Sequence, residues 1–150
     1  KRIHTTALLW ANALVLCAGA THAASQGPSL SFALIGDQPY NPALEAATDQ
    51  LLTHIDQDES TRWIIHLGDI KGGGEPCSNA LIDRRLRQIQ GTQKALVFIP
   101  GDNEWTDCHR ESNGNHNSQE RLAHLRQVAF NKPETFGKQG FKVRHQRSEE

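Results

Sequence analysis

Three aspartates stand directly after a glycine, and each pair ends a short apolar segment. The pairs are Gly36-Asp37, Gly68-Asp69 and Gly101-Asp102, and the segments cover residues 30–35, 63–67 and 95–99. Apolar runs of this length are typical of buried strands, and open α/β sheets place their sites at the carboxyl edge of the strands. Three carboxylates at one edge repel one another unless a cation lies between them. The pattern therefore predicts a metal site, whereas a single Gly-Asp pair would indicate only a turn.

The segment after the third aspartate carries further groups that could act on a phosphoester. Asn103 offers an amide oxygen, and His109 could donate a proton to a leaving group. Arg110 could bind a phosphate through two hydrogen bonds. Each also has a simpler interpretation, because a lone histidine is usually a surface residue and a lone arginine usually pairs with a carboxylate. Glu104 and Asp107 could serve only as caps within the loop.

Strands that alternate with helices must position these groups. The order strand-helix-strand-helix-strand-loop-helix predicts a mainly parallel sheet with right-handed crossovers. His66 lies within the second strand, which favours a core position over a metal ligand. A weak strand is expected at 141–143. The first expected helix follows the cap Asn41, with Pro42 in its first turn, and its apolar face is Leu44, Thr48, Leu51 and Ile55. The second follows the cap Ser78, has the apolar face Ile82, Leu86 and Ile89, and ends at Gly91. The third comes after residue 117 and has the apolar face Leu122, Leu125 and Ala129.

The first residues predict export from the cytoplasm. Lys1 and Arg2 precede an apolar run at 7–19, and small residues follow at 20–24. This is the layout of a secretory signal peptide that covers residues 1–23, and the run is short for a membrane span. We therefore expect a secreted or periplasmic protein without a membrane anchor. A buried N-terminal helix is the alternative.

Two cysteines lie beyond the predicted signal peptide. In an oxidising compartment, Cys77 and Cys108 are expected to form a disulfide, which would stabilise the fold by roughly 3–4 kcal/mol. Two buried thiols are the alternative. A zinc site is disfavoured because the Cys-x-x-Cys spacing is missing.

The charge balance argues against an anionic macromolecule as partner. Removal of residues 1–23 takes away two basic residues and no acidic one, so the net charge moves from −1 to −3. This gives no electrostatic case for binding nucleic acid or an anionic membrane. The basic run 84–87 lies within a helical pattern and is expected to be a solvated face.

The three Gly-Asp pairs, in this order after three strands, resemble the first three motifs of the calcineurin-like metallophosphoesterases. The stretch 100–110, Pro-Gly-Asp-Asn-Glu-Trp-Thr-Asp-Cys-His-Arg, is similar to a secreted bacterial branch of that superfamily. The resemblance implies a four-layer α/β/β/α sandwich, of which residues 30–150 would be the N-terminal part. It also implies a centre of two divalent metal ions, with manganese, iron and zinc as candidates. Asp37 matches a ligand of the first metal, Asp69 the bridging carboxylate, and Asp102 the place of a ligand asparagine.

The chain departs from the family pattern at several positions. Pro39 stands where the first motif usually has a histidine, and Tyr40 is a candidate to replace it as a ligand or a hydrogen-bond donor. Asn103 stands where the third motif usually has its catalytic histidine, which makes His109 a substitute candidate. The later histidine motifs do not occur before residue 150.

These features predict a metal-dependent phosphoester hydrolase in which an activated water attacks phosphorus. Asp37, Asp69 and Asp102 would hold the metals, Asn103 and His109 would occupy catalytic positions, and Arg110 would bind a small phosphoester substrate. The alternative is a secreted domain of the same fold that has lost catalysis. Pro39 and Asn103 favour that alternative, and the three carboxylates oppose it.

Overall fold

The computed structural model describes residues 30–144, so the expected signal peptide lies outside the described residues. The predicted alternation of strands and helices is confirmed. Within residues 30–144, no helix is long and apolar enough to cross a membrane. The elements in chain order are β1 (Ser31–Ile35), a 3-10 turn (Pro42–Leu44), α1 (Glu45–Gln57), β2 (Thr61–His66), α2 (Asn79–Gln90), β3 (Ala95–Phe98), two 3-10 turns (Thr106–His109 and Glu111–Asn113) and α3 (Ser118–Ala129).

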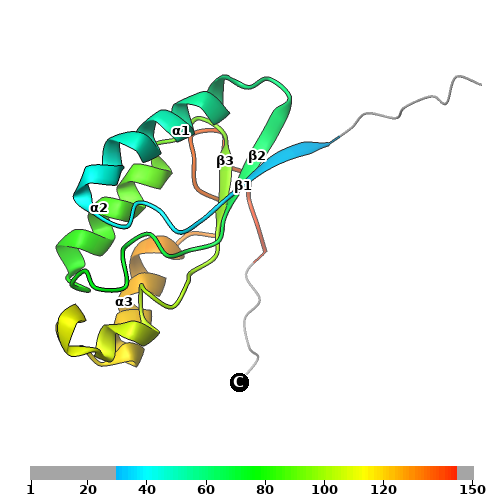
Figure 1. The fold of residues 1–150 in the computed structure, drawn as a ribbon. Coiled ribbons are helices and arrows are strands. Elements are labelled where there is room, and N and C mark those ends of the chain that lie inside the picture. The colour runs from blue at the N-terminus through cyan, green and yellow to red at the C-terminus, as the bar shows by residue number, and fades with distance from the viewer. Residues whose placement is uncertain (1–29, 145–150) are drawn as a thin grey trace, which may run out of the picture.

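The three strands form one parallel sheet in the order β1-β2-β3. Ile35 is in register with His66, and His66 with Phe98, so the three carboxyl ends lie at the same edge (Figure 1). Parallel strands need crossover connections, and the two crossovers here contain α1 and α2. The fold class is therefore mixed α/β with a three-stranded parallel sheet, as the sequence predicts.

One face of the sheet packs against the helices, which Figure 1 shows along one side of the strands. Ile64 of β2 and Leu96 of β3 are fully buried. They share a core with the apolar faces of the helices, so burial of these faces stabilises the crossovers. The core consists of Leu52, Ile64, Ile70, Ile82, Leu86, Ile89, Leu96, Phe98, Leu125 and Ala129.

The opposite face of the sheet is apolar and partly exposed. Leu34, Ile65 and Val97 face this side by register, and the exposed fraction of Leu34 is 58%. Phe32 makes an edge-to-face contact with Trp63, at 6.2 Å between ring centroids. A sheet face of this kind normally packs against another layer.

The second and third helices agree with the sequence expectation, and the first differs in detail. Ser78 caps α2 by accepting a hydrogen bond from the nitrogen of Leu81, and Gly91 is its C-cap. Asn41 makes no side-chain cap, and α1 begins only at Glu45, because the chain first forms a 3-10 turn at Pro42–Leu44. Leu52, rather than Leu51, is the buried leucine of α1, whereas Leu44 is 42% exposed.

Two further expectations need correction. Residues 141–143 form no strand; Lys142 makes only an isolated bridge with Glu134. The basic run 84–87 is not uniformly solvated, because Arg85 is fully buried. Its guanidinium pairs with Glu45 at 2.6 Å and with Glu75 at 3.2 Å. A buried arginine needs such partners to offset its desolvation, and they come from elements too distant in sequence to be paired from a helical pattern.

Candidate metal-binding edge

The backbone turns sharply where β1 and β2 end. Asp37 and Asp69 both have positive φ angles, of 58° and 54°, and Gly68 has a φ of 83°. Aspartate tolerates this left-handed conformation better than most residues. The nitrogen of Asp37 donates to the carbonyl oxygen of Gly68 at 3.1 Å, so the first two turns are joined. Non-glycine residues held in such conformations cluster at functional sites.

The glycines of the second and third pairs let two turns touch. A Cβ added at Gly68 would overlap the nitrogen of Gly101 and lie 2.6 Å from the carbonyl carbon of Pro100. A Cβ added at Gly101 would overlap Oδ1 of Asp69 and lie 2.7 Å from its nitrogen. The Gly-Asp pattern thus reflects close packing between neighbouring turns as well as backbone freedom.

Tyr40 joins the first two carboxylates. The Tyr40 hydroxyl donates a hydrogen bond to Oδ1 of Asp37, and the Tyr40 hydroxyl oxygen lies 3.4 Å from Oδ2 of Asp69. These contacts bring together side chains that are 29 residues apart in sequence. The pKa of the Tyr40 phenol is raised, chiefly because its proton is held by Asp37 and also because of burial and the charge of Asp69.

Asp69 is the electrostatic centre of this edge. Partial burial raises the pKa of its carboxyl, and the charges of Asp102 and Asp37 raise it further. Hydrogen bonds from the nitrogen of Asn103 and from Tyr40 oppose the shift. The expected repulsion between the carboxylates therefore acts on Asp69, although burial is the larger cause of its raised pKa.

Glu104 is a buried carboxylate that sequence reasoning placed only as a loop cap. Its side chain is 1% exposed, and Oε1 accepts a hydrogen bond from the nitrogen of Ile70 at 2.5 Å. Its Oε2 is buried without a hydrogen-bond partner among the described residues. Burial raises the pKa of this carboxyl to about 7. A buried oxygen without a hydrogen-bond partner costs free energy unless a ligand binds it. In the sequence, the available signal for Glu104 was its acidic type within the third motif.

The residues expected to act on substrate have other partners in the structure. Asn103 is 6% exposed, and its side-chain nitrogen donates to the carbonyl oxygen of Lys71 at 3.1 Å. His109 is exposed, and its Nδ1 lies 2.7 Å from the carbonyl oxygen of Thr106. Arg110 pairs with Asp107 at 2.7 Å, with half of its side chain exposed.

The predicted disulfide is confirmed. Cys77 and Cys108 are bonded, and their Cα atoms are 5.6 Å apart. Both sulfur atoms lie 3.6 Å from the carbonyl oxygen of Asn103. The disulfide bond therefore links the loop after Asp69 to the loop after Asp102, next to Asn103.

The fit of a metal ion can be judged from the donors themselves. Within residues 30–144, no three His, Cys, Asp or Glu side chains are grouped as ligands of one ion. The chemistry of the donors nevertheless suits a hard cation, which prefers carboxylate oxygens. The unpaired Oε2 of Glu104 agrees with such a cation.

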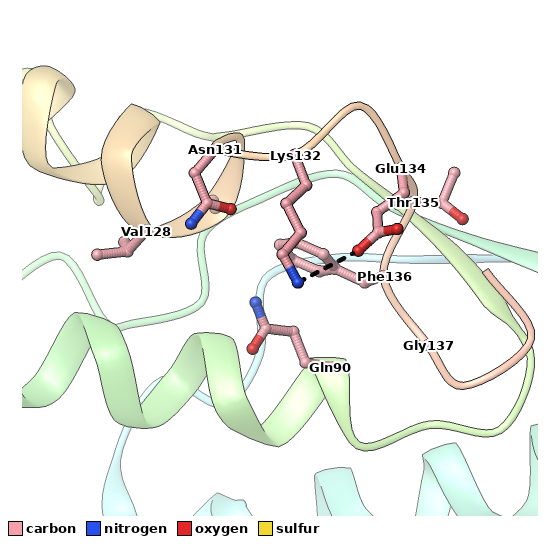
Figure 2. A pocket seen from close by; sticks show the side chains of 9 residues that line it. Gln90, Val128, Asn131, Lys132, Glu134, Thr135, Phe136 and Gly137 are labelled. Carbon is pink, nitrogen blue, oxygen red and sulfur yellow. Dashed lines mark ion pairs between the residues drawn. The ribbon is translucent and has the colours of Figure 1, made fainter. Parts of the chain in front are cut away.

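A separate cleft of about 310 Å³ lies between α2, the end of α3 and the segment after it. Figure 2 shows Gln90 from α2 facing Asn131, with the ion pair of Lys132 and Glu134 across the opening. The three aspartates do not line this cleft. It is a surface hollow at the other end of the fold and takes no part in the candidate site.

Comparisons with protein-family models, curated proteins and solved structures found no significant match to this chain. A functional conclusion therefore has to come from the side chains at the sheet edge.

Proposed function

We propose that this chain is the N-terminal part of a secreted, calcineurin-like metallophosphoesterase domain. The observation that carries the proposal is the joining of Asp37 and Asp69 by the hydroxyl of Tyr40 at the carboxyl edge of a parallel sheet. Open α/β sheets place their sites at this edge. The order of the three Gly-Asp pairs along the chain agrees with the family's first three motifs.

The exposed face of the sheet supports the four-layer part of the proposal. Leu34 is 58% exposed and Phe32 is 48% exposed on the face opposite the helices. Apolar sheet faces are normally buried against another layer. In the proposed sandwich, a second sheet of the same domain would pack on this face.

The residues of the edge have distinct proposed roles. Asp37, Asp69 and Asp102 would bind two divalent cations, and Asp69, flanked by the charges of the other two, would bridge them. Bound there, the cations would supply Lewis acidity and lower the pKa of a coordinated water. Arg110 would contribute positive charge for a phosphate group while Asp107 orients its guanidinium.

A non-catalytic domain of the same fold is the second candidate. Asn103 favours it, because this residue is buried and its amide donates to the main chain of Lys71. The position that should carry a proton donor is therefore occupied by Asn103, whose side chain is bound to the main chain of a neighbouring loop. His109, whose Nδ1 lies against the carbonyl oxygen of Thr106, could take that role only through its Nε2.

The decisive experiment measures metal content and hydrolysis together. The full-length protein should contain bound divalent metal by mass spectrometry and hydrolyse p-nitrophenyl phosphate or bis(p-nitrophenyl) phosphate. Asp69→Asn should lose both properties while it retains its circular dichroism spectrum. Glu59→Gln removes a carboxylate from the exposed turn before β2 and should retain both properties.

Each outcome separates the candidates. Bound metal that Asp69→Asn abolishes, without hydrolysis of either substrate, would favour the non-catalytic domain. Absence of metal from the wild-type protein, or metal content unchanged in Asp69→Asn, would overturn the proposed site.

A further inference from the structure

We infer that oxidation of Cys77 and Cys108 closes a layer of loops that can open while the rest of the fold stays intact. The loop layer consists of residues 71–78 and 102–117, and the disulfide joins its two segments. The redox state of the cysteines then determines whether the carboxyl edge of the sheet is assembled. The inference goes beyond the proposed hydrolysis and does not depend on it.

The loop layer contributes little to the apolar core. The buried core residues lie outside the two segments, and of the described residues within them, only the partly buried Trp105 packs against that core. The side chains that are buried in the layer, apart from the two cysteines, are polar or charged: Lys71, Asn103, Glu104, Asp107 and Asn113. Buried polar groups give much less net stabilisation than buried apolar surface. The layer therefore lacks the contacts that stabilise the strands and helices.

The main chains of the two cysteines hold the surrounding turns together. The nitrogen of Cys77 donates to the carbonyl oxygen of Asn113 at 2.9 Å. The nitrogen of His116 donates to the carbonyl oxygen of Cys108 at 2.8 Å. The carbonyl oxygen of Cys77 accepts a hydrogen bond from Nη1 of Arg121, at 2.8 Å, which connects the layer to α3. Separation of the two segments would break these hydrogen bonds together.

The disulfide opposes that separation more strongly than the hydrogen bonds do. Each hydrogen bond is exchanged for one with water when the layer opens, so its net contribution is small. Segments with few buried apolar contacts open at the lowest free-energy cost in a protein. A covalent bond across a sequence separation of 31 removes much of the chain entropy that opening would gain. Without the bond, the layer should open more readily than the core.

Asn103 connects the disulfide to the carboxyl edge. Its carbonyl oxygen lies 3.6 Å from both sulfur atoms, and its main-chain nitrogen donates to Oδ1 of Asp69 at 3.2 Å. Its side-chain nitrogen donates to the carbonyl oxygen of Lys71, in the other segment of the layer. Opening of the layer would therefore remove a hydrogen bond from Asp69 as well as the link between the two segments.

The closing step is a thiol–disulfide exchange with an external protein disulfide. The two thiols lose two protons and two electrons, and the external disulfide accepts them and becomes two thiols. Both cysteines are fully buried in the closed layer, so a reductant reaches the bond only after the layer opens. The bond is thus protected once it has formed, and oxidation acts as an assembly step.

The test measures amide hydrogen exchange by NMR in the full-length protein. Three forms are compared: the oxidised protein, the protein reduced with a phosphine in denaturant and refolded, and Cys77→Ala with Cys108→Ala. Loss of the bond should accelerate exchange at position 77 and His116 at least about tenfold more than at Leu67 and Leu96, whose amides join strands to their neighbours. The phosphine should not change exchange in the double variant, which controls for the reagent.

Three results would overturn the inference. Equal acceleration of the layer and strand amides would show that the bond stabilises the chain as one cooperative unit. Unchanged exchange at His116 would show that the layer stays closed without the bond. A double variant without native circular dichroism would show that the core does not fold without it. None of these results bears on metal binding, which the comparison of wild type with Asp69→Asn tests separately.

Discussion

The main-chain nitrogen of Asn103 donates to Oδ1 of Asp69 over 3.2 Å, which ties the loop after β3 to the carboxylate after β2. The carbonyl oxygen of Asn103 lies against the disulfide, and its side chain donates to Lys71. Its main-chain nitrogen, its carbonyl oxygen and its side-chain nitrogen thus all belong to the framework of the edge. Asn103 therefore positions Asp69 through its main chain, a contact that does not depend on the side chain at position 103.

Gly101→Ala should destabilise the edge, because the new Cβ would overlap Asp69 Oδ1 and approach its backbone nitrogen at 2.7 Å. Overpacking of this kind costs about 1–3 kcal/mol, which urea denaturation at neutral pH can resolve. Metal binding by the same variant should weaken, because Asp69 must rotate. Gly74→Ala is the matched control, since an added Cβ there meets nothing within 4 Å. Equal stability of the two variants would contradict the close packing.

Much of the fold could be predicted because its elements are local. Strands built on short apolar runs and helices with a clear buried face define β1 to β3, α2 and α3. Errors arise where tertiary contacts decide. The leucines at 44, 51 and 52 all fit a helical face, but the packing of α1 on the sheet makes Leu52 the buried one. The ion pairs of Arg85 join α2 to α1 and to the loop at Glu75, which no local pattern connects.

The location of the three aspartates at one sheet edge could be predicted from the sequence, whereas the contacts around them could not. Gly-Asp after each strand places three aspartates at one edge, since parallel strands end together. The contact of Tyr40 with Asp69 spans 29 residues, and the burial of Glu104 depends on packing against the loop at Ile70. Both are properties of loop packing, for which sequence periodicity carries no signal.

Replacement of both cysteines should reveal how much the disulfide stabilises the fold. The bond closes a loop with a sequence separation of 31, which corresponds to roughly 3–4 kcal/mol of lost loop entropy in the unfolded chain. Cys77→Ser with Cys108→Ser should lower the free energy of unfolding by that amount in urea titrations. A loss below about 1 kcal/mol would indicate that the loops hold their positions without the covalent bond.

The stability of the fold should fall at acidic pH because of His66. Burial lowers the pKa of its imidazole from 6.5 to about 4, opposed by the backbone of Gln38 and the charge of Asp37. The unfolded chain therefore binds a proton that the folded chain excludes between these two values. This contribution to stability is complete above pH 6.5 and is lost as the pH falls toward 4, by about 3 kcal/mol.

His66→Gln should remove this pH dependence, since glutamine can accept the hydrogen bond from Gly68 but does not titrate. The measurement is the free energy of unfolding in urea at several pH values from 4 to 7.5, compared between variant and wild type. His54→Gln, which replaces an exposed histidine of α1, should keep the wild-type dependence. A His66→Gln variant with the same acid dependence as wild type would contradict the assignment.

A thiol placed on the exposed sheet face tests whether a second sheet covers it. Leu34 lies on β1, on the face opposite the helices, and is 58% exposed in residues 30–144. In the full-length protein, the proposed sandwich would bury this position, so Leu34→Cys should react with a maleimide at least tenfold more slowly than Glu59→Cys in the exposed turn before β2. Both thiols should react equally fast in denaturant, which excludes an intrinsic difference in reactivity. Equal rates in the native protein would mean that this face is open to solvent, and the four-layer arrangement would then be wrong even if the metal-binding edge is correct.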